Sequence, residues 1–130
     1  MSNLYSSARE AFLTGNLSWT SNTVKAVLVN GYTYSDAHAY LSDLGAAAVA
    51  TSPALTSKTS SGGVADAADV TFPAVTGNSV EAIVLFADTG TASTSRLIAY
   101  VDNATGLPVT PTGGNITIQW DNGASRIFSL

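Results

Sequence analysis

The stretch VEAIVLFA, residues 80–87, is the clearest indication of the fold class in this sequence. All of its residues except Glu81 are apolar, and such runs are typical of β-strands that are covered on both faces. We therefore expect a central strand here. Its expected antiparallel partner is RLIAYV, residues 96–101, which follows across a loop of small residues, 88–95.

The chain before and after this pair contains further strand and turn signals. VKAVLV, residues 24–29, is mostly apolar on both faces and predicts another covered strand, followed by a turn at Asn30-Gly31. The pattern is weaker between residues 46 and 72, which are rich in Ala, Ser and Thr. There we expect strands near 48–51 and 64–72, the most loop-like stretch at 60–63, and a turn at 76–78.

Two short helices are expected. Leu4, Ala8, Ala11 and Phe12 share one face of a helix over residues 3–14, and Gly15 is placed to end it. This helix either packs on its own sheet or reaches to a neighbouring subunit. A second helix is predicted over residues 36–44, with Ser35 or Asp36 as its N-cap and Gly45 as its end.

The C-terminal residues predict a β-hairpin. In residues 116–120 Ile, Ile and Trp alternate with polar residues, and an apolar strand, 127–130, follows a turn signal. A two-residue loop, 122–123, would separate the two apolar stripes, whereas a three-residue loop, 121–123, with Gly123 left-handed, puts them on one face. We expect the second. The whole chain is then one mainly β domain, residues 1–130, a compact sandwich or barrel with two short helices.

Composition excludes several function classes. The chain has nine acidic and only five basic residues, and the basic residues are scattered, so we expect no nucleic-acid partner. There is no cysteine, hence no disulfide and no thiolate chemistry. No apolar run approaches the roughly 20 residues of a membrane span, and the N-terminus does not resemble a secretory signal. We expect no membrane partner and synthesis in a cytoplasm.

One motif resembles an enzyme fingerprint. Residues 85–91, Leu-Phe-Ala-Asp-Thr-Gly-Thr, resemble the aspartic-protease pattern of two hydrophobic residues, any residue, Asp-Thr-Gly and then Ser or Thr. In those proteases two aspartates share a proton and activate water. That fold also needs a later strand of two large apolar residues followed by Gly, which residues 96–103 and 115–122 do not supply. We therefore interpret Asp88-Thr89-Gly90 as a turn, keep the protease as a remote alternative, and expect no enzyme.

The other candidate ligands are isolated. His38 is the single histidine and has no Cys or second His to complete a zinc site. Asp66 and Asp69 lack the oxygen-rich, glycine-containing loop that usually holds calcium. We expect no metal, no cofactor and no catalytic residue.

Aromatic residues concentrate in the N-terminal third and are either core or an anchor patch for a partner. Tyrosine and tryptophan dominate interface hot spots, so a partner-binding patch is an alternative to a core position. The candidate partner-binding residues are Tyr5, Phe12, Trp19, Tyr32 and Tyr34.

Several segments together resemble a known protein family. They are YSSAREAFLTG (residues 5–15) with Trp19 and KAVL (25–28), DVTF (69–72), TSRLIAY (94–100), ATGLPVTP (104–111) and ITIQWDNG (116–123). In this combination the chain resembles small structural proteins encoded by tailed bacteriophages.

The resemblance implies a virion component and carries over no functional residues. We expect a capsid decoration (cement) protein that binds the major capsid protein on the outer surface of the head and stabilises the shell by mass action. A neck or tail component is the alternative. We also expect self-association as a homotrimer, because closed symmetry is usual for identical chains and capsids offer three-fold positions.

Overall fold

The computed structural model describes residues 2–102, 104–120 and 127–129. These residues form one α-helix, one 3-10 helix and ten β-strands, arranged in antiparallel sheets. In chain order the elements are β1 (Ser2–Leu4), α1 (Ser6–Thr14), β2 (Val24–Val29), η1 (Leu41–Ala47), β3 (Ala48–Thr51), β4 (Thr59–Ser61), β5 (Val64–Asp66), β6 (Val70–Phe72), β7 (Ala82–Ala87), β8 (Arg96–Val101), β9 (Ile116–Ile118) and β10 (Phe128–Ser129).

The largest sheet has five strands in the order β1-β8-β7-β2-β3. The predicted central strand is confirmed, because β7 lies between β8 and β2 and all six of its residues are buried. The predicted pairing of β7 with β8 is also confirmed, with Ile83 opposite Val101 and Val84 opposite Tyr100. The described residues therefore have the mainly β, sandwich-like fold that the sequence predicts, and their sheets do not close into a barrel.

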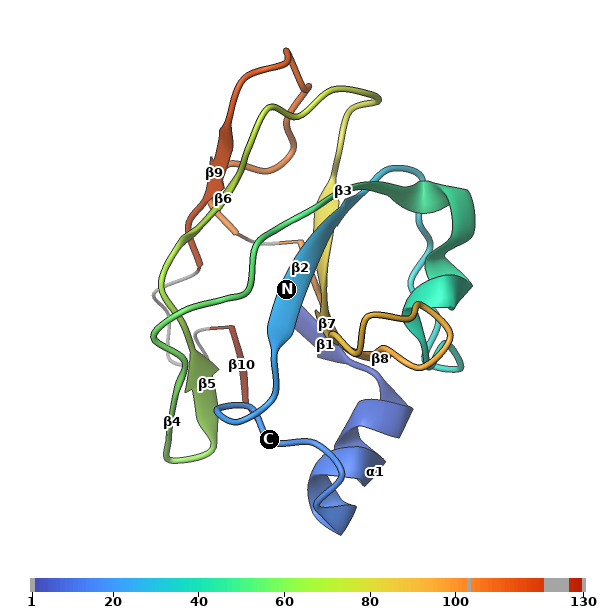
Figure 1. The fold of residues 1–130 in the computed structure, drawn as a ribbon, viewed down its shortest axis with the longest axis vertical. Helices are drawn as coiled ribbons and strands as arrows, with labels where there is room; N and C mark the ends of the chain where they lie inside the picture. The colour runs from blue at the N-terminus through green and yellow to red at the C-terminus, as the bar shows by residue number, and fades with distance from the viewer. Residues whose placement is uncertain (1, 103, 121–126, 130) are drawn as a thin grey trace.

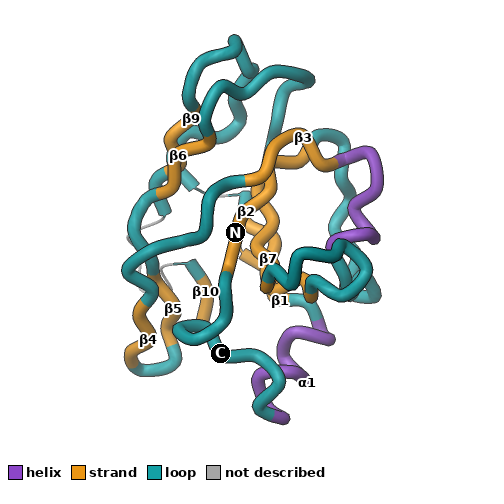
Figure 2. The backbone as a smooth tube through the Cα atoms, viewed as in Figure 1, coloured by secondary structure: helices purple, strands orange, loops and turns teal. Residues whose placement is uncertain are grey.

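Two smaller sheets form the second layer of the sandwich, β10-β5-β4 and β6-β9. Figures 1 and 2 show them on one side of the five-stranded sheet, with η1 and the segment before it on the other. On that other side Tyr32 and Tyr34 pack on Tyr100 of β8, with ring centroids 6.0 and 5.7 Å apart. The chain thus covers both apolar faces of its central strands without help from a neighbouring subunit.

The first predicted helix is three residues shorter than expected at its N-terminus. Residues 2–4 form the edge strand β1, in which Leu4 lies opposite Ala99 of β8, and the Tyr5 N–H then donates to the Ile98 carbonyl at 3.1 Å. Sheet hydrogen bonds therefore replace the first helical turn. The predicted end at Gly15 is confirmed, because Gly15 is left-handed with φ 80°.

The second predicted helix, 36–44, is wrong in position and type. The observed element is the 3-10 helix η1, residues 41–47, and Gly45 lies inside it at a non-helical kink. Residues 39–40 pair with the start of β8 instead, where the Leu97 N–H donates to the Ala39 carbonyl at 2.9 Å. The Asp43 carboxylate accepts hydrogen bonds from the Ala39 and Tyr40 N–H groups, so the capped turn begins several residues later than predicted.

The expected strand over 64–72 is two strands in two different sheets, β5 and β6. Two indole N–H groups bind backbone carbonyls where the chain leaves β5 for β6. Trp19 donates to the Asp66 carbonyl at 3.1 Å, and Trp120 donates to the Ala68 carbonyl at 3.0 Å. The stretch 60–63 is only partly a loop. Its first two residues belong to β4, and Gly62 and Gly63, both with positive φ, make the turn into β5.

The predicted C-terminal hairpin is wrong. Strand β9 pairs with β6, with Ile118 opposite Val70, whereas β10 pairs with β5, with Phe128 opposite Ala65. Because β5 and β6 each take one of the expected partners, β9 and β10 end in separate sheets. The expected loop, 121–123, lies outside the described residues. The apolar stripe is nevertheless buried, including Trp120.

Candidate interaction surface

Helix α1 carries Leu13, the large hydrophobic side chain that is exposed among the described residues, and has a hollow on each flank. Ala8 and Ala11 are buried and attach the helix to the body of the protein. The C-terminal end is closed by the Asn16 N–H, which donates to the Ala11 carbonyl at 2.8 Å after the left-handed Gly15. The helix is therefore a fixed support for the side chains that it presents to solvent.

The N-terminus of α1 is held by a segment thirty residues away. Asp36 accepts a hydrogen bond from the Ser6 N–H at 2.9 Å and a second one from the Ser6 hydroxyl. The Tyr34 hydroxyl also donates to Asp36, at 3.1 Å. The hydrogen bond from the Ser6 hydroxyl, and next the one from Tyr34, lower the pKa of Asp36. A carboxylate at this position also interacts favourably with the helix dipole.

A chain of aromatic hydroxyl groups links the same segment to the core. The hydroxyls of Tyr5 and Tyr32 are 2.8 Å apart, and the Tyr32 hydroxyl lies 2.8 Å from Nδ1 of His38. Tyr34 donates to the Leu4 carbonyl at 2.8 Å. Burial, and next the hydrogen bond with Tyr32, raises the pKa of Tyr5 far above its ordinary value, so Tyr5 stays protonated. This tyrosine chain, Tyr5–Tyr32–His38, fixes the segment that caps α1.

An apolar groove lies on the outer side of α1. Its lining residues are Arg9, Phe12, Leu13 and Ser129, and its volume is about 470 Å³. Leu13 is 88% exposed, while Phe12 beside it is only half-buried. A second hollow of about 250 Å³ lies beyond Phe12, against Leu17, Trp19, Phe128 and the β4–β5 turn. The two hollows meet at Phe12, so the apolar surface continues from the helix onto the small sheet.

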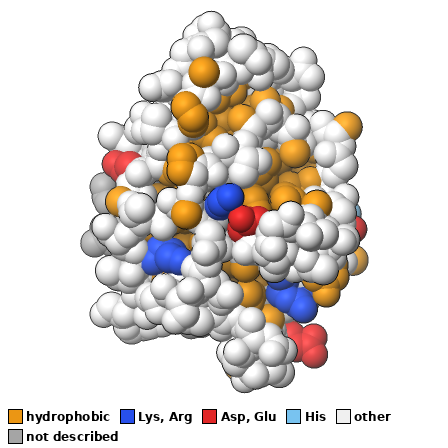
Figure 3. All heavy atoms as spheres, in the orientation of Figure 1, with side chains coloured by type: hydrophobic (Ala, Val, Ile, Leu, Met, Phe, Trp, Pro, Cys, Tyr) orange, Lys and Arg blue, Asp and Glu red, His pale blue; other side chains and the backbone are white. Residues whose placement is uncertain are grey.

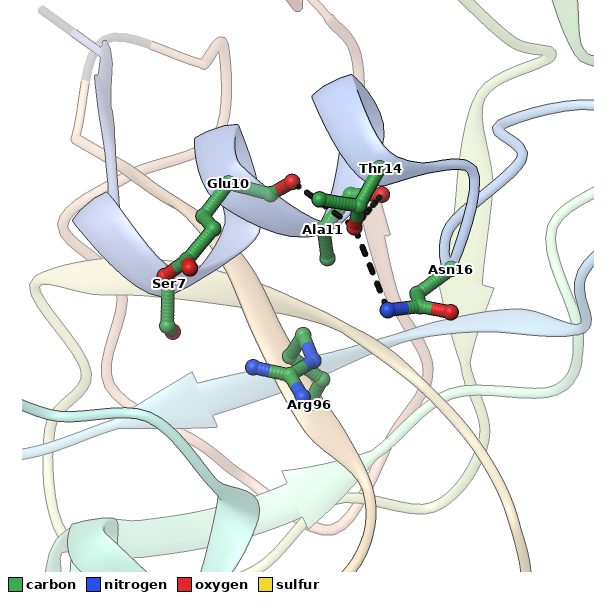
Figure 4. Close-up of a pocket in the computed structure, with 6 residues that line it drawn as sticks. All are labelled: Ser7, Glu10, Ala11, Thr14, Asn16 and Arg96. Atoms are coloured by element: carbon green, nitrogen blue, oxygen red, sulfur yellow. Dashed lines mark hydrogen bonds between the residues drawn. The ribbon is translucent and has the colours of Figure 1, made fainter.

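The opposite flank of α1 is polar. Figure 4 shows Arg96 reaching from β8 into the space beneath the helix, where Ser7, Glu10, Ala11, Thr14 and Asn16 complete a hollow of about 190 Å³. The Arg96 guanidinium lies over the Tyr40 ring, 5.2 Å from its centroid. The Ser7 hydroxyl is buried and has no hydrogen-bond partner among the described residues.

The five predicted partner-binding residues do not form one exposed patch. Tyr5, Trp19 and Tyr32 are buried in the core of their own chain, and Tyr34 is half-buried against Tyr100. Of the five, Phe12 lines the apolar groove. Whether any of them binds a partner stays a prediction.

Sequence reasoning missed Leu13 and Arg96 as surface features. Leu13 lies off the apolar face of α1, and an apolar residue on the solvent side of a short helix was the available signal. No local pattern places Arg96 beside the helix, because that contact depends on how β8 packs against α1.

Asp88 is part of a turn and an ion pair. Its carboxylate lies 3.0 Å from the Lys25 ammonium and accepts a hydrogen bond from the Gly90 N–H at 3.1 Å. The ion pair with Lys25, followed by the Gly90 hydrogen bond, lowers the pKa of Asp88. Such an arrangement is typical of an Asx turn at a strand end.

The remaining candidate ligands lie apart from one another. No group of three or more His, Asp or Glu side chains able to hold a metal occurs among residues 2–102, 104–120 and 127–129. His38 is half-buried beside Tyr32, and Asp69 is exposed. In the same part of the chain, no helix is long and apolar enough to cross a membrane.

Comparison of the sequence with protein-family models and with curated proteins finds no match.

Proposed function

We propose that this protein is a structural component of a bacteriophage virion, a decoration protein on the outer surface of the capsid. The observation that carries the proposal is the second apolar hollow beside α1, of about 250 Å³, where Trp19 and Phe128 lie against the β4–β5 turn. Apolar groups arranged in this way on a soluble domain are typical of protein contact sites. The resemblance to small tailed-phage structural proteins supplies the partner, the major capsid protein.

The character of the remaining surface supports the same function. Only 11% of the residues are charged, and the face drawn in Figure 3 has few charged side chains among hydrophobic side chains and the white atoms of the backbone and of other side chains. Such a surface is desolvated at less cost than a densely charged one, which favours broad contact with another protein. A domain that binds the assembled shell more tightly than free subunits stabilises the shell by mass action.

The proposal is tested by an inventory of purified phage particles. Mass spectrometry with copy-number calibration should find the protein in hundreds of copies per particle, which is the number expected for a capsid surface lattice. About a dozen copies or fewer would move the protein to the neck or tail and contradict the decoration role. Absence from the particle would contradict a virion function altogether.

A further inference from the structure

The exposed face of α1 carries both a protruding side chain and a hollow that can receive one. Leu13 is 88% exposed, and it forms one wall of the groove whose other walls are Arg9, Phe12 and Ser129. Because the protrusion and the hollow belong to the same short helix, a second copy of the chain brings a matching protrusion to each hollow.

Charges on the two sides of Leu13 are opposite in sign. Arg9 precedes Leu13 by four residues and Glu10 by three, so one lies on each side of Leu13 along the helix surface. Both side chains are exposed. An apolar position with a cation on one side and an anion on the other is the arrangement with which parallel helices select one another.

We propose that α1 is the contact between copies of this protein in a closed ring, with Leu13 of each copy inserted in the groove of the next. With the helices parallel, the Glu10 side of one helix meets the Arg9 side of its neighbour at every contact. An antiparallel pair centred on Leu13 would instead place Arg9 opposite residues 15–17, which carry no charge. The charges therefore favour the parallel, cyclic arrangement.

The size of the contact determines when the ring forms. One leucine and a few flanking groups are far smaller than the roughly 1,200–2,000 Å² that stable interfaces bury. The ring is therefore weak in dilute solution and forms at high protein concentration or where a particle holds the copies side by side. In this second setting the inference rests on the proposed function.

The test is sedimentation velocity of the purified full chain, from micromolar to millimolar concentration. The parent protein should shift from monomer to a closed ring of two to four copies, with a trimer expected at a capsid three-fold position. Leu13→Glu should weaken this association at least tenfold, and Thr33→Glu, on an exposed residue of another segment, should leave it unchanged. Circular dichroism of each variant checks that the fold is intact.

Charge reversal tests the parallel arrangement. Arg9→Glu and Glu10→Arg should each weaken the ring, because each single change places like charges across every contact. The double variant Arg9→Glu/Glu10→Arg should restore it, since both sides change sign together. A parent protein that stays monomeric up to millimolar concentration, or a ring unaffected by Leu13→Glu, would overturn the proposed contact.

A cross-linking measurement gives an independent readout. The chain has no cysteine, so Leu13→Cys introduces a single thiol. Under mild oxidation it should form disulfide-linked dimers much faster than Ala92→Cys, an exposed control on the β7–β8 loop, and equal rates would contradict the contact. Neither experiment uses a particle. Failure of the ring is therefore distinguishable from failure of the virion function, which the particle inventory measures.

Discussion

The carboxylate of Asp36 caps the helix that begins at Ser6, with 2.9 Å between its Oδ1 and the Ser6 backbone nitrogen. The two residues are separated by thirty positions and by strand β2. The candidate interaction surface on α1 is therefore held in place by a segment that lies across the five-stranded sheet from the second layer. Changes in that segment should therefore affect α1, although the two are far apart in sequence.

Asp36→Asn should destabilise the protein, because the neutral side chain loses its favourable interaction with the helix dipole and one of its two strong acceptors. The folded state lowers the pKa of Asp36, so its contribution is present above the ordinary carboxyl pKa and is lost as the pH falls through the folded value. Urea unfolding at pH 7 and at pH 3 should therefore show a difference from the parent that shrinks at the lower pH. Asp69→Asn, on an exposed residue away from α1, is the control. A difference that is equal at both pH values would contradict the cap.

Tyr32→Phe should cost about 1–3 kcal/mol of unfolding free energy, because it interrupts the hydrogen-bond chain and leaves the buried Tyr5 hydroxyl without its partner. Tyr5→Phe should cost less, since the Tyr32 hydroxyl keeps its contact with His38. Chemical denaturation of both single variants and the double variant gives the coupling energy. Equal costs that add in the double variant would argue against a connected chain.

The buried Tyr5 predicts that the protein loses stability at alkaline pH. The folded state raises the pKa of Tyr5, so its contribution is complete below the ordinary tyrosine pKa of 10.0 and is lost progressively as the pH rises above it. The denaturant concentration at the unfolding midpoint of the parent should decrease as the pH is raised from 9 to 11.5. The decrease should be smaller in Tyr5→Phe. Tyr40→Phe serves as the matched control. A slope that Tyr5→Phe leaves unchanged would contradict the assignment.

Trp120→Ala should destabilise the protein by about 3–5 kcal/mol, as expected for removal of a large buried side chain. Trp120→Phe should cost less but still measurably, because it retains much of the packing and loses the hydrogen bond to the Ala68 carbonyl. Guanidinium denaturation monitored by far-ultraviolet circular dichroism measures both. If neither variant shifts the midpoint, the burial of Trp120 and its hydrogen bond to Ala68 do not stabilise the fold.

Asp88→Asn should change the unfolding free energy by no more than about 1 kcal/mol, since the ion pair with Lys25 is partly exposed. Particle assembly should also be unchanged. The change tests the remote protease alternative as well, because an aspartic protease loses its activity when the catalytic aspartate becomes asparagine. A proteolytic activity of the parent that disappears in Asp88→Asn would contradict the proposed structural role.

The sequence by itself determined the strands whose residues are apolar on both faces, β2, β7 and β8, and the end of α1 at Gly15. These features depend on local chemistry, because an unbroken apolar run needs cover on both sides and a left-handed residue favours glycine. The same local reasoning leaves Leu13 on the exposed side of its helix, although that signal was missed.

Only the tertiary structure decided which strands pair and which surfaces meet. Residues 116–118 and 128–129 have the pattern of a hairpin, yet β6 and β5 compete for them and take one each. Likewise, local sequence predicts that Asp36 caps its own helix, whereas it caps α1. Leu4 is predicted to be helical, whereas it extends the five-stranded sheet. In each case a partner distant in sequence satisfies the backbone hydrogen bonds, and local periodicity contains no information about that partner.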